Sequence, residues 1–131
     1  MTEDAELRLP SGRACVLRPK PLPLLPTYHI LFFPSEQGAL TQGEEAGMFA
    51  LAQRVAADLG RRFHGDPGCY AILFSGGRTR RRPWPHFHIV AVPDLRAKRR
   101  ALFLLHIKQL LIRVARVQAW LRMLRWRRSH V

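Results

Sequence analysis

The chain has 131 residues, 47% of them hydrophobic, which is enough for a single domain with a proper core. It contains no run of about 18 uncharged apolar residues, and its acidic N-terminus lacks an apolar core, so neither a transmembrane helix nor a secretory signal is expected. The formal net charge is +13, and residues 61–131 hold 17 of the 22 basic residues but only two acidic ones. This asymmetry predicts a polyanionic partner or a phosphate-bearing ligand near the C-terminal half, or else a solvated basic face without a specific ligand.

The first half of the chain alternates short strand patterns with one helix pattern. Short apolar runs around a Pro-Ser-Gly turn predict a hairpin over Leu7–Val16, and the Pro-rich segment Arg18–Pro26 is expected to be an extended loop. The apolar run Tyr28–Phe33 predicts a buried strand. Apolar residues recur at intervals of three and four positions over Glu44–Leu59. This spacing predicts an amphipathic helix that ends at Gly60.

The second half continues with two strands and a long helix. Tyr70–Phe74 and His86–Val92 are the expected strands, and a basic loop joins them. Pro93 and Asp94 then open a helix, with Asp94 as its N-cap, that runs from about Leu95 almost to the end of the chain. The order of elements predicts an α+β fold.

Cysteine content favours a reducing compartment. Cys15 and Cys69 are too few and too far apart for a disulfide framework or a zinc knuckle, so we expect both to be small core residues. The expected localisation is cytoplasmic.

The most informative segment is the strand that carries His86 and His88. Successive strand side chains point to opposite faces, so His86, His88 and Val90 share one face and both imidazoles can reach one phosphate or metal. A neutral imidazole is a competent nucleophile toward phosphorus near neutral pH. The alternative is a pair of half-buried histidines without a ligand. A structural metal site needs four ligands, and nothing pairs the remote candidates His64, His106 and Cys69, so no metal or other cofactor is predicted.

This segment resembles the signature of the histidine-triad (HIT) superfamily, His-φ-His-φ-His-φ-φ, with Val90 in place of the third histidine. Leu25–Pro34 is similar to the family's strand before the helix, residues 48–59 to its helix, and residues 70–77 to its central strand and glycine turn. The resemblance covers about residues 7–93. It implies one antiparallel sheet with a main helix as a HIT-like domain over residues 1–93, and a homodimer. The family does not account for residues 94–131, which we expect to form a basic amphipathic helix that packs on the domain or on a dimer partner.

The resemblance also implies roles for individual residues. His88 takes the place of the nucleophile that attacks the α-phosphorus of a nucleotide, and His86 would orient it or contact a phosphate oxygen. His29 aligns with a family histidine and also suits a structural role. Further phosphate- or nucleotide-binding positions are Gln37, where the family often has histidine, Ser75, which matches an asparagine, and Arg81 and Arg82, which with Arg78 and Arg80 form the loop before the histidine strand.

Two functions follow from this. One is a HIT-like nucleotide-binding protein, with hydrolysis or nucleotidyl transfer through a nucleotidyl-histidine intermediate. The other is a catalytically inactive HIT-like binding or scaffold module whose basic helix contacts nucleic acid, a membrane or a protein partner. Gln37, Pro83 and Val90 favour the second function, whereas His86, His88 and the arginines favour the first.

The C-terminal helix carries a seam of apolar residues at alternating steps of four and three. We expect residues 95–128 to form one continuous helix with this seam buried in the protein or its dimer and the arginines exposed. A membrane-surface helix and a nucleic-acid contact are the alternatives. The seam consists of Phe103, Ile107, Leu110, Val114, Val117, Leu121 and Leu124.

Overall fold

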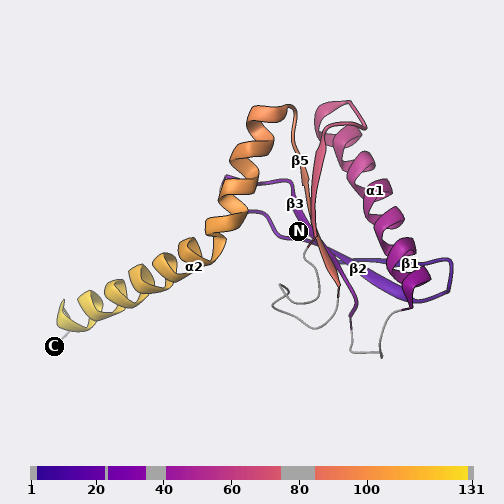
Figure 1. Cartoon of the computed structure of the whole chain (residues 1–131). Coiled ribbons are helices and arrows are strands. Elements are labelled where there is room, and N and C mark those ends of the chain that lie inside the picture. Colours follow the sequence, from indigo (N-terminus) through magenta and orange to yellow (C-terminus); the bar gives the residue numbers. More distant parts are fainter. Residues whose placement is uncertain (1–2, 23, 35–40, 75–84, 130–131) are drawn as a thin grey trace.

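The computed structural model describes residues 3–22, 24–34, 41–74 and 85–129, and over this part of the chain it confirms the α+β prediction. A five-stranded antiparallel sheet forms the middle layer, with helix α1 on one face and the first half of helix α2 on the other (Figure 1).

The five strands follow the sequence prediction closely. They are β1 (Ala5–Arg8), β2 (Ala14–Pro19), β3 (Tyr28–Phe32), β4 (Tyr70–Phe74) and β5 (His86–Ala91), and their order in the sheet is β1-β2-β3-β5-β4. The hairpin is therefore confirmed. Its second strand continues to Pro19 because residues 16–19 pair with β3, so the Pro-rich segment begins as strand and not as loop.

Helix α1 (Gln42–His64) is longer at both ends than the predicted helix. Its N-terminus has a capping box: the amide of Glu44 donates to Oγ1 of Thr41, and the carboxylate of Glu44 accepts from the Thr41 amide. The prediction that Gly60 ends the helix is wrong, since Gly65 is the C-cap, with φ of 71°. Gly60 lies where the helix meets the following turn, and a Cβ there would stand 2.6 Å from the carbonyl oxygen of Asp66.

The larger part of the core lies between α1 and the sheet. On the sheet side it contains Leu31 of β3 and Phe87 and Ile89 of β5, whose side chains alternate with those of the opposite face. On the helix side it contains Met48, Leu51, Ala52, Ala56 and Leu59, the face that the three-and-four spacing predicts.

Helix α2 (Leu95–Ser129) covers the other face of the sheet with its first half. Asp94 is its N-cap, as predicted, and accepts a 2.7 Å hydrogen bond from the amide of Ala97. Ala97, Ala101 and Leu104 face a smaller apolar cluster around Tyr28 and Val90. The small alanines let the helix approach the strands closely.

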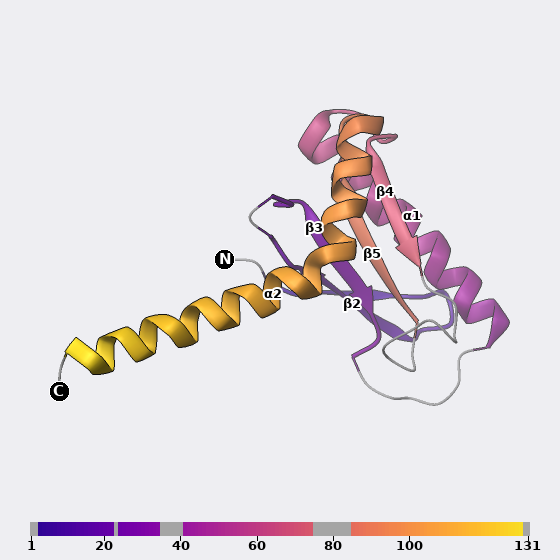
Figure 2. The same ribbon diagram turned by 60° about the vertical axis from the view of Figure 1, so that its left-hand side comes forward.

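The second half of α2 turns away from the domain and extends beyond it (Figures 1 and 2). The helix is continuous, as predicted, but most of its seam is not buried within the described chain. Ile107 packs partly against the apolar cluster under α2, whereas Phe103, one turn earlier, is 62% exposed on the outward side of the helix. Of the helices that the structure describes, none has the apolar length needed to cross a membrane.

Candidate functional site

The two histidines of β5 lie on the sheet face that α2 covers. His86 and His88 are partly exposed, whereas Val90 on the same face is 1% exposed and belongs to the apolar cluster under α2. The position that the HIT resemblance aligns with a third histidine is therefore a core position in this protein. An imidazole at residue 90 would place polar nitrogens in this cluster, and the valine avoids that cost.

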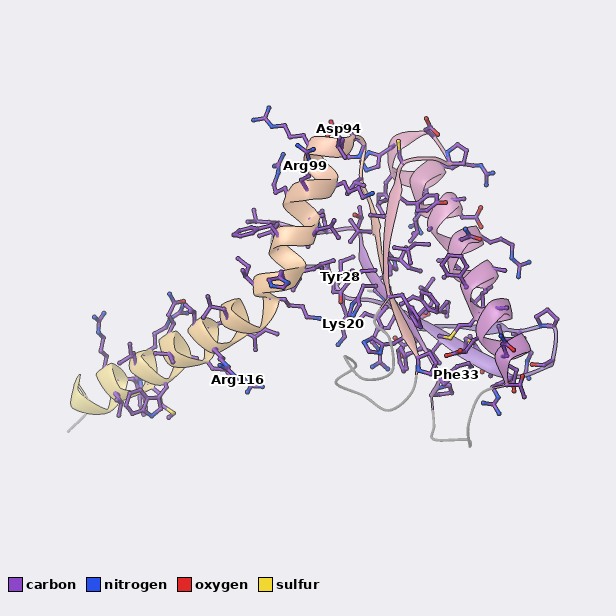
Figure 3. The ribbon with its side chains drawn as sticks, in the orientation of Figure 1. Lys20, Tyr28, Phe33, Asp94, Arg99 and Arg116 are labelled. Carbon is purple, nitrogen blue, oxygen red and sulfur yellow. The ribbon has the colours of Figure 1, made fainter. Side chains whose placement is uncertain are left out.

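Three side chains from three elements form a hydrogen-bonded series that ends at His88. Lys108 of α2 donates from Nζ to the Tyr28 hydroxyl oxygen over 3.1 Å, and that hydroxyl is 2.5 Å from Nδ1 of His88. The Lys108 ammonium also stands 5.2 Å from the centroid of the Tyr28 ring, which stacks on the His88 ring at 5.8 Å. Tyr28 is fully buried between the sheet and α2 (Figure 3).

The chemistry of these groups assigns the protons. Burial raises the pKa of Tyr28 well above its usual value, so the phenol keeps its proton. An ammonium group only donates, so the phenol proton of Tyr28 goes to Nδ1 of His88. Burial, helped by the positive charges of Lys108, His86 and Lys20, lowers the pKa of His88 to about 4. His88 is therefore neutral at pH 7, with Nδ1 as hydrogen-bond acceptor and Nε2 as N–H donor.

The second histidine and an ion pair of Arg18 with Asp4 lie beside this series. The ring centroids of His86 and His88 are 5.0 Å apart in an edge-to-face arrangement. His86 pairs across the sheet with Phe32, and the guanidinium carbon of Arg18 stands 4.9 Å from the Phe32 ring. Arg18 also forms a bidentate ion pair with Asp4 at the exposed edge of this face.

The other predicted site residues are not part of this group. His29 is on the opposite face of β3, is 8% exposed, and its Nδ1 is 2.8 Å from the carbonyl oxygen of Thr27. Burial lowers the pKa of His29. The structure does not bring His29 together with His86 and His88. The predicted site residues Gln37, Ser75, Arg81 and Arg82 lie outside the described residues, as do Arg78, Arg80 and Pro83.

Tyr28 and Lys108 are the functional residues that the sequence prediction missed. The sequence contains a spacing pattern that could have identified Lys108. Lys108 follows Ala97, Ala101 and Leu104 at steps of four, three and four, so it shares the helix face that packs on the sheet. Only the pairing of Tyr28 with Val90 across the sheet places its hydroxyl beside residue 88.

The two cysteines are free: Cys15 is buried in the core, and Cys69 is partly exposed. Within the described part of the chain, no three or more His, Cys, Asp or Glu side chains come together as a set of metal ligands. No family model, no curated protein and no solved structure matches this chain.

Proposed function

We propose that the protein binds a phosphate-bearing small molecule at His86 and His88, and that nucleoside phosphates, which the HIT resemblance implies, are its ligand class. The observation that carries this proposal is the state of His88. Its imidazole is neutral, its Nδ1 is occupied by the Tyr28 hydroxyl, and its Nε2–H is a hydrogen-bond donor on a partly exposed surface.

The charges around the imidazoles favour an anion. The positive charges of Lys20 and Lys108 act on His88, and the same field stabilises a phosphate oxygen that accepts from Nε2–H. A bound dianion also opposes the effect of these lysines and raises the pKa of His88. Binding of the dianion is then coupled to proton uptake by the imidazole.

Calorimetric titration tests the proposal with a nucleoside monophosphate and the matching nucleoside. We expect the monophosphate to bind and the nucleoside to bind much more weakly. His88→Ala and His86→Ala should each lower the affinity on the order of tenfold to a hundredfold, the effect of one lost hydrogen bond to a charged group. His64→Gln, at the exposed end of α1, is the matched control and should leave the affinity unchanged. Equal affinities for nucleoside and monophosphate contradict the proposal.

A second candidate is nucleotidyl hydrolysis or transfer through His88. Neutrality of the imidazole at pH 7 favours it, because a protonated imidazole has no nucleophilic lone pair. Attack from Nε2 first requires the other tautomer: Nε2 loses its proton to water while Nδ1 gains one. The N–P bond then forms as the bond from phosphorus to the leaving group breaks, and water later cleaves the N–P bond.

Mass spectrometry of the intact protein distinguishes the two functions. Incubation with a nucleoside 5′-phosphoramidate should give a nucleotidyl adduct in the wild type and none in His88→Gln if transfer occurs. Tyr28→Phe removes the group that holds Nδ1 as acceptor, so it should increase adduct formation. If the wild type and Tyr28→Phe both bind the ligand without adduct or turnover, binding is the function.

Cellular location belongs to the same proposal. Nucleoside phosphates and the free thiols of Cys15 and Cys69 both suit the reducing cytoplasm.

A further inference from the structure

The second half of α2 presents a narrow apolar seam that nothing in the described chain covers. Val114, Val117 and Leu121 are 46%, 54% and 48% exposed, and they lie on one side of the helix with Leu110 and Leu124. A continuous apolar stripe of this kind is uncommon on the surface of a monomer and marks an interaction surface.

The helix itself needs a partner. In proteins most of the stability of a helix comes from the packing of an apolar face against another element. Here the exposed Arg113, Arg116, Arg122 and Arg125 repel one another along the helix, and no acidic residue follows Asp94 to offset them. Packing of the seam against another element would supply the missing stabilisation.

We propose that a second copy of this chain covers the seam, and that the two α2 helices form a parallel two-stranded coiled coil beyond the domains. The proposal is independent of the ligand that the histidine site binds. In heptad notation Val114 and Leu121 occupy a positions, and Leu110, Val117 and Leu124 occupy d positions. Val114 at a and Leu110 and Leu124 at d match the preference of the parallel dimer, whereas Leu121 at a and Val117 at d invert it.

The flanking positions of this arrangement avoid like charges across the interface. In a parallel pair each g residue faces the partner's next e residue. Arg113 at g then faces Gln118 at e, and Trp120 at g faces Arg125 at e, which permits a cation–π contact. Arg116 and Arg122 occupy outward c and b positions.

The length of the seam sets the size of the interface. From Phe103 to Leu124 the helix rises about 32 Å, so a partner helix about 10 Å wide would cover a strip of about 640 Å² over both protomers. This is below the roughly 1,000 Å² of a stable interface, so we expect a weak dimer that dissociates on dilution. The seam begins at Phe103, on the outward side of the half that packs on the domain.

A membrane surface fits this helix less well. A helix that lies in the lipid headgroup region needs one broad apolar face. Here Ile112, Met123 and Trp126 are exposed on the side opposite the seam, and arginines lie between the two stripes. A strict a/d stripe is the narrower pattern of a coiled coil.

Sedimentation velocity of the full chain over a wide range of concentrations tests the proposal. The wild type should be a dimer that dissociates on dilution. Val117→Arg should be monomeric, because the substitution puts like charges at a d position. Met123→Arg adds the same charge at a site of similar exposure (50%) on the opposite side, so it should remain dimeric. A wild type that is monomeric throughout, or equal loss of the dimer in both variants, would overturn the proposal.

The register has its own test. Gln118→Glu places a carboxylate opposite the partner's Arg113 and should tighten the dimer several-fold, whereas Gln118→Lys should weaken it several-fold. With Arg113→Gln in the background the gain from Gln118→Glu should disappear. A weaker dimer for Gln118→Glu overturns the parallel arrangement. Binding of a monomeric wild type to vesicles of phosphatidylserine and phosphatidylcholine, lost in Val117→Arg, would assign the seam to a membrane instead.

Discussion

The neutral state of His88 makes a sharp prediction about stability and pH. Its pKa is about 4 in the folded protein and 6.5 as the ordinary value for histidine, so the folded state binds fewer protons than the unfolded chain between these values. The contribution of neutral His88 to the free energy of unfolding is therefore fully present above pH 6.5, and it is lost as the pH falls toward 4. His88→Gln removes the titrating group, while its amide oxygen can still accept from the Tyr28 hydroxyl.

The two pKa values set the magnitude of the effect. Between pH 7 and pH 4.5 they predict that His88 alone lowers the free energy of unfolding by about 2.5 kcal/mol. The ring is partly exposed, and solvent screening reduces this to about 2 kcal/mol.

Urea unfolding followed by circular dichroism at several pH values measures the difference. The wild type should lose about 2 kcal/mol more than His88→Gln from pH 7 to pH 4.5. The buried His29 contributes equally to both proteins and cancels. Parallel curves for the wild type and His88→Gln would refute the assignment of a neutral, buried His88.

Three further predictions concern the scaffold, and thermal or urea unfolding checks each of them. Thr41→Ala removes the side-chain acceptor of the α1 capping box and should cost about 1 kcal/mol, and an unchanged stability would contradict the cap. Gly60→Ala should lower the free energy of unfolding by about 1–3 kcal/mol, because the added Cβ meets the carbonyl oxygen of Asp66. Alanine in place of glycine inside a helix usually stabilises, so a more stable variant would show that this contact relaxes. Met48→Ala leaves a cavity at a fully buried position and should lower the free energy of unfolding by about 2–5 kcal/mol. Met123→Ala, on the exposed second half of α2, should change it by no more than about 0.5 kcal/mol.

Local patterns in the sequence were sufficient for most of the fold. Alternation along His86–Val92 predicted that the two imidazoles share a face, and the structure has their rings 5.0 Å apart. Three-and-four spacing predicted the buried face of α1. Gly60 shows the limit of such reasoning, because a helix stop and a close approach of another backbone both favour glycine.

The contacts that define the site depend on distant parts of the chain. Tyr28 and Lys108 are 80 positions apart, and they meet only because α2 packs on β3 with its alanine face. Apolar spacing on α2 likewise predicted a buried seam, but spacing does not say which element buries it. Two faces of the helix carry small or apolar residues, and the sheet takes the face with Ala97 and Ala101 because that face permits the closest approach.

The most direct test of the site is the ¹⁵N spectrum of the His88 ring at pH 7, recorded through long-range ¹H–¹⁵N correlations while a nucleoside monophosphate is added. We expect a neutral ring protonated at Nε2, with Nδ1 as acceptor, and a saturable shift of the His88 and His86 signals as the ligand binds. A ring that is protonated at both nitrogens or at Nδ1 alone in the free protein, together with signals that do not respond to the ligand, would contradict it.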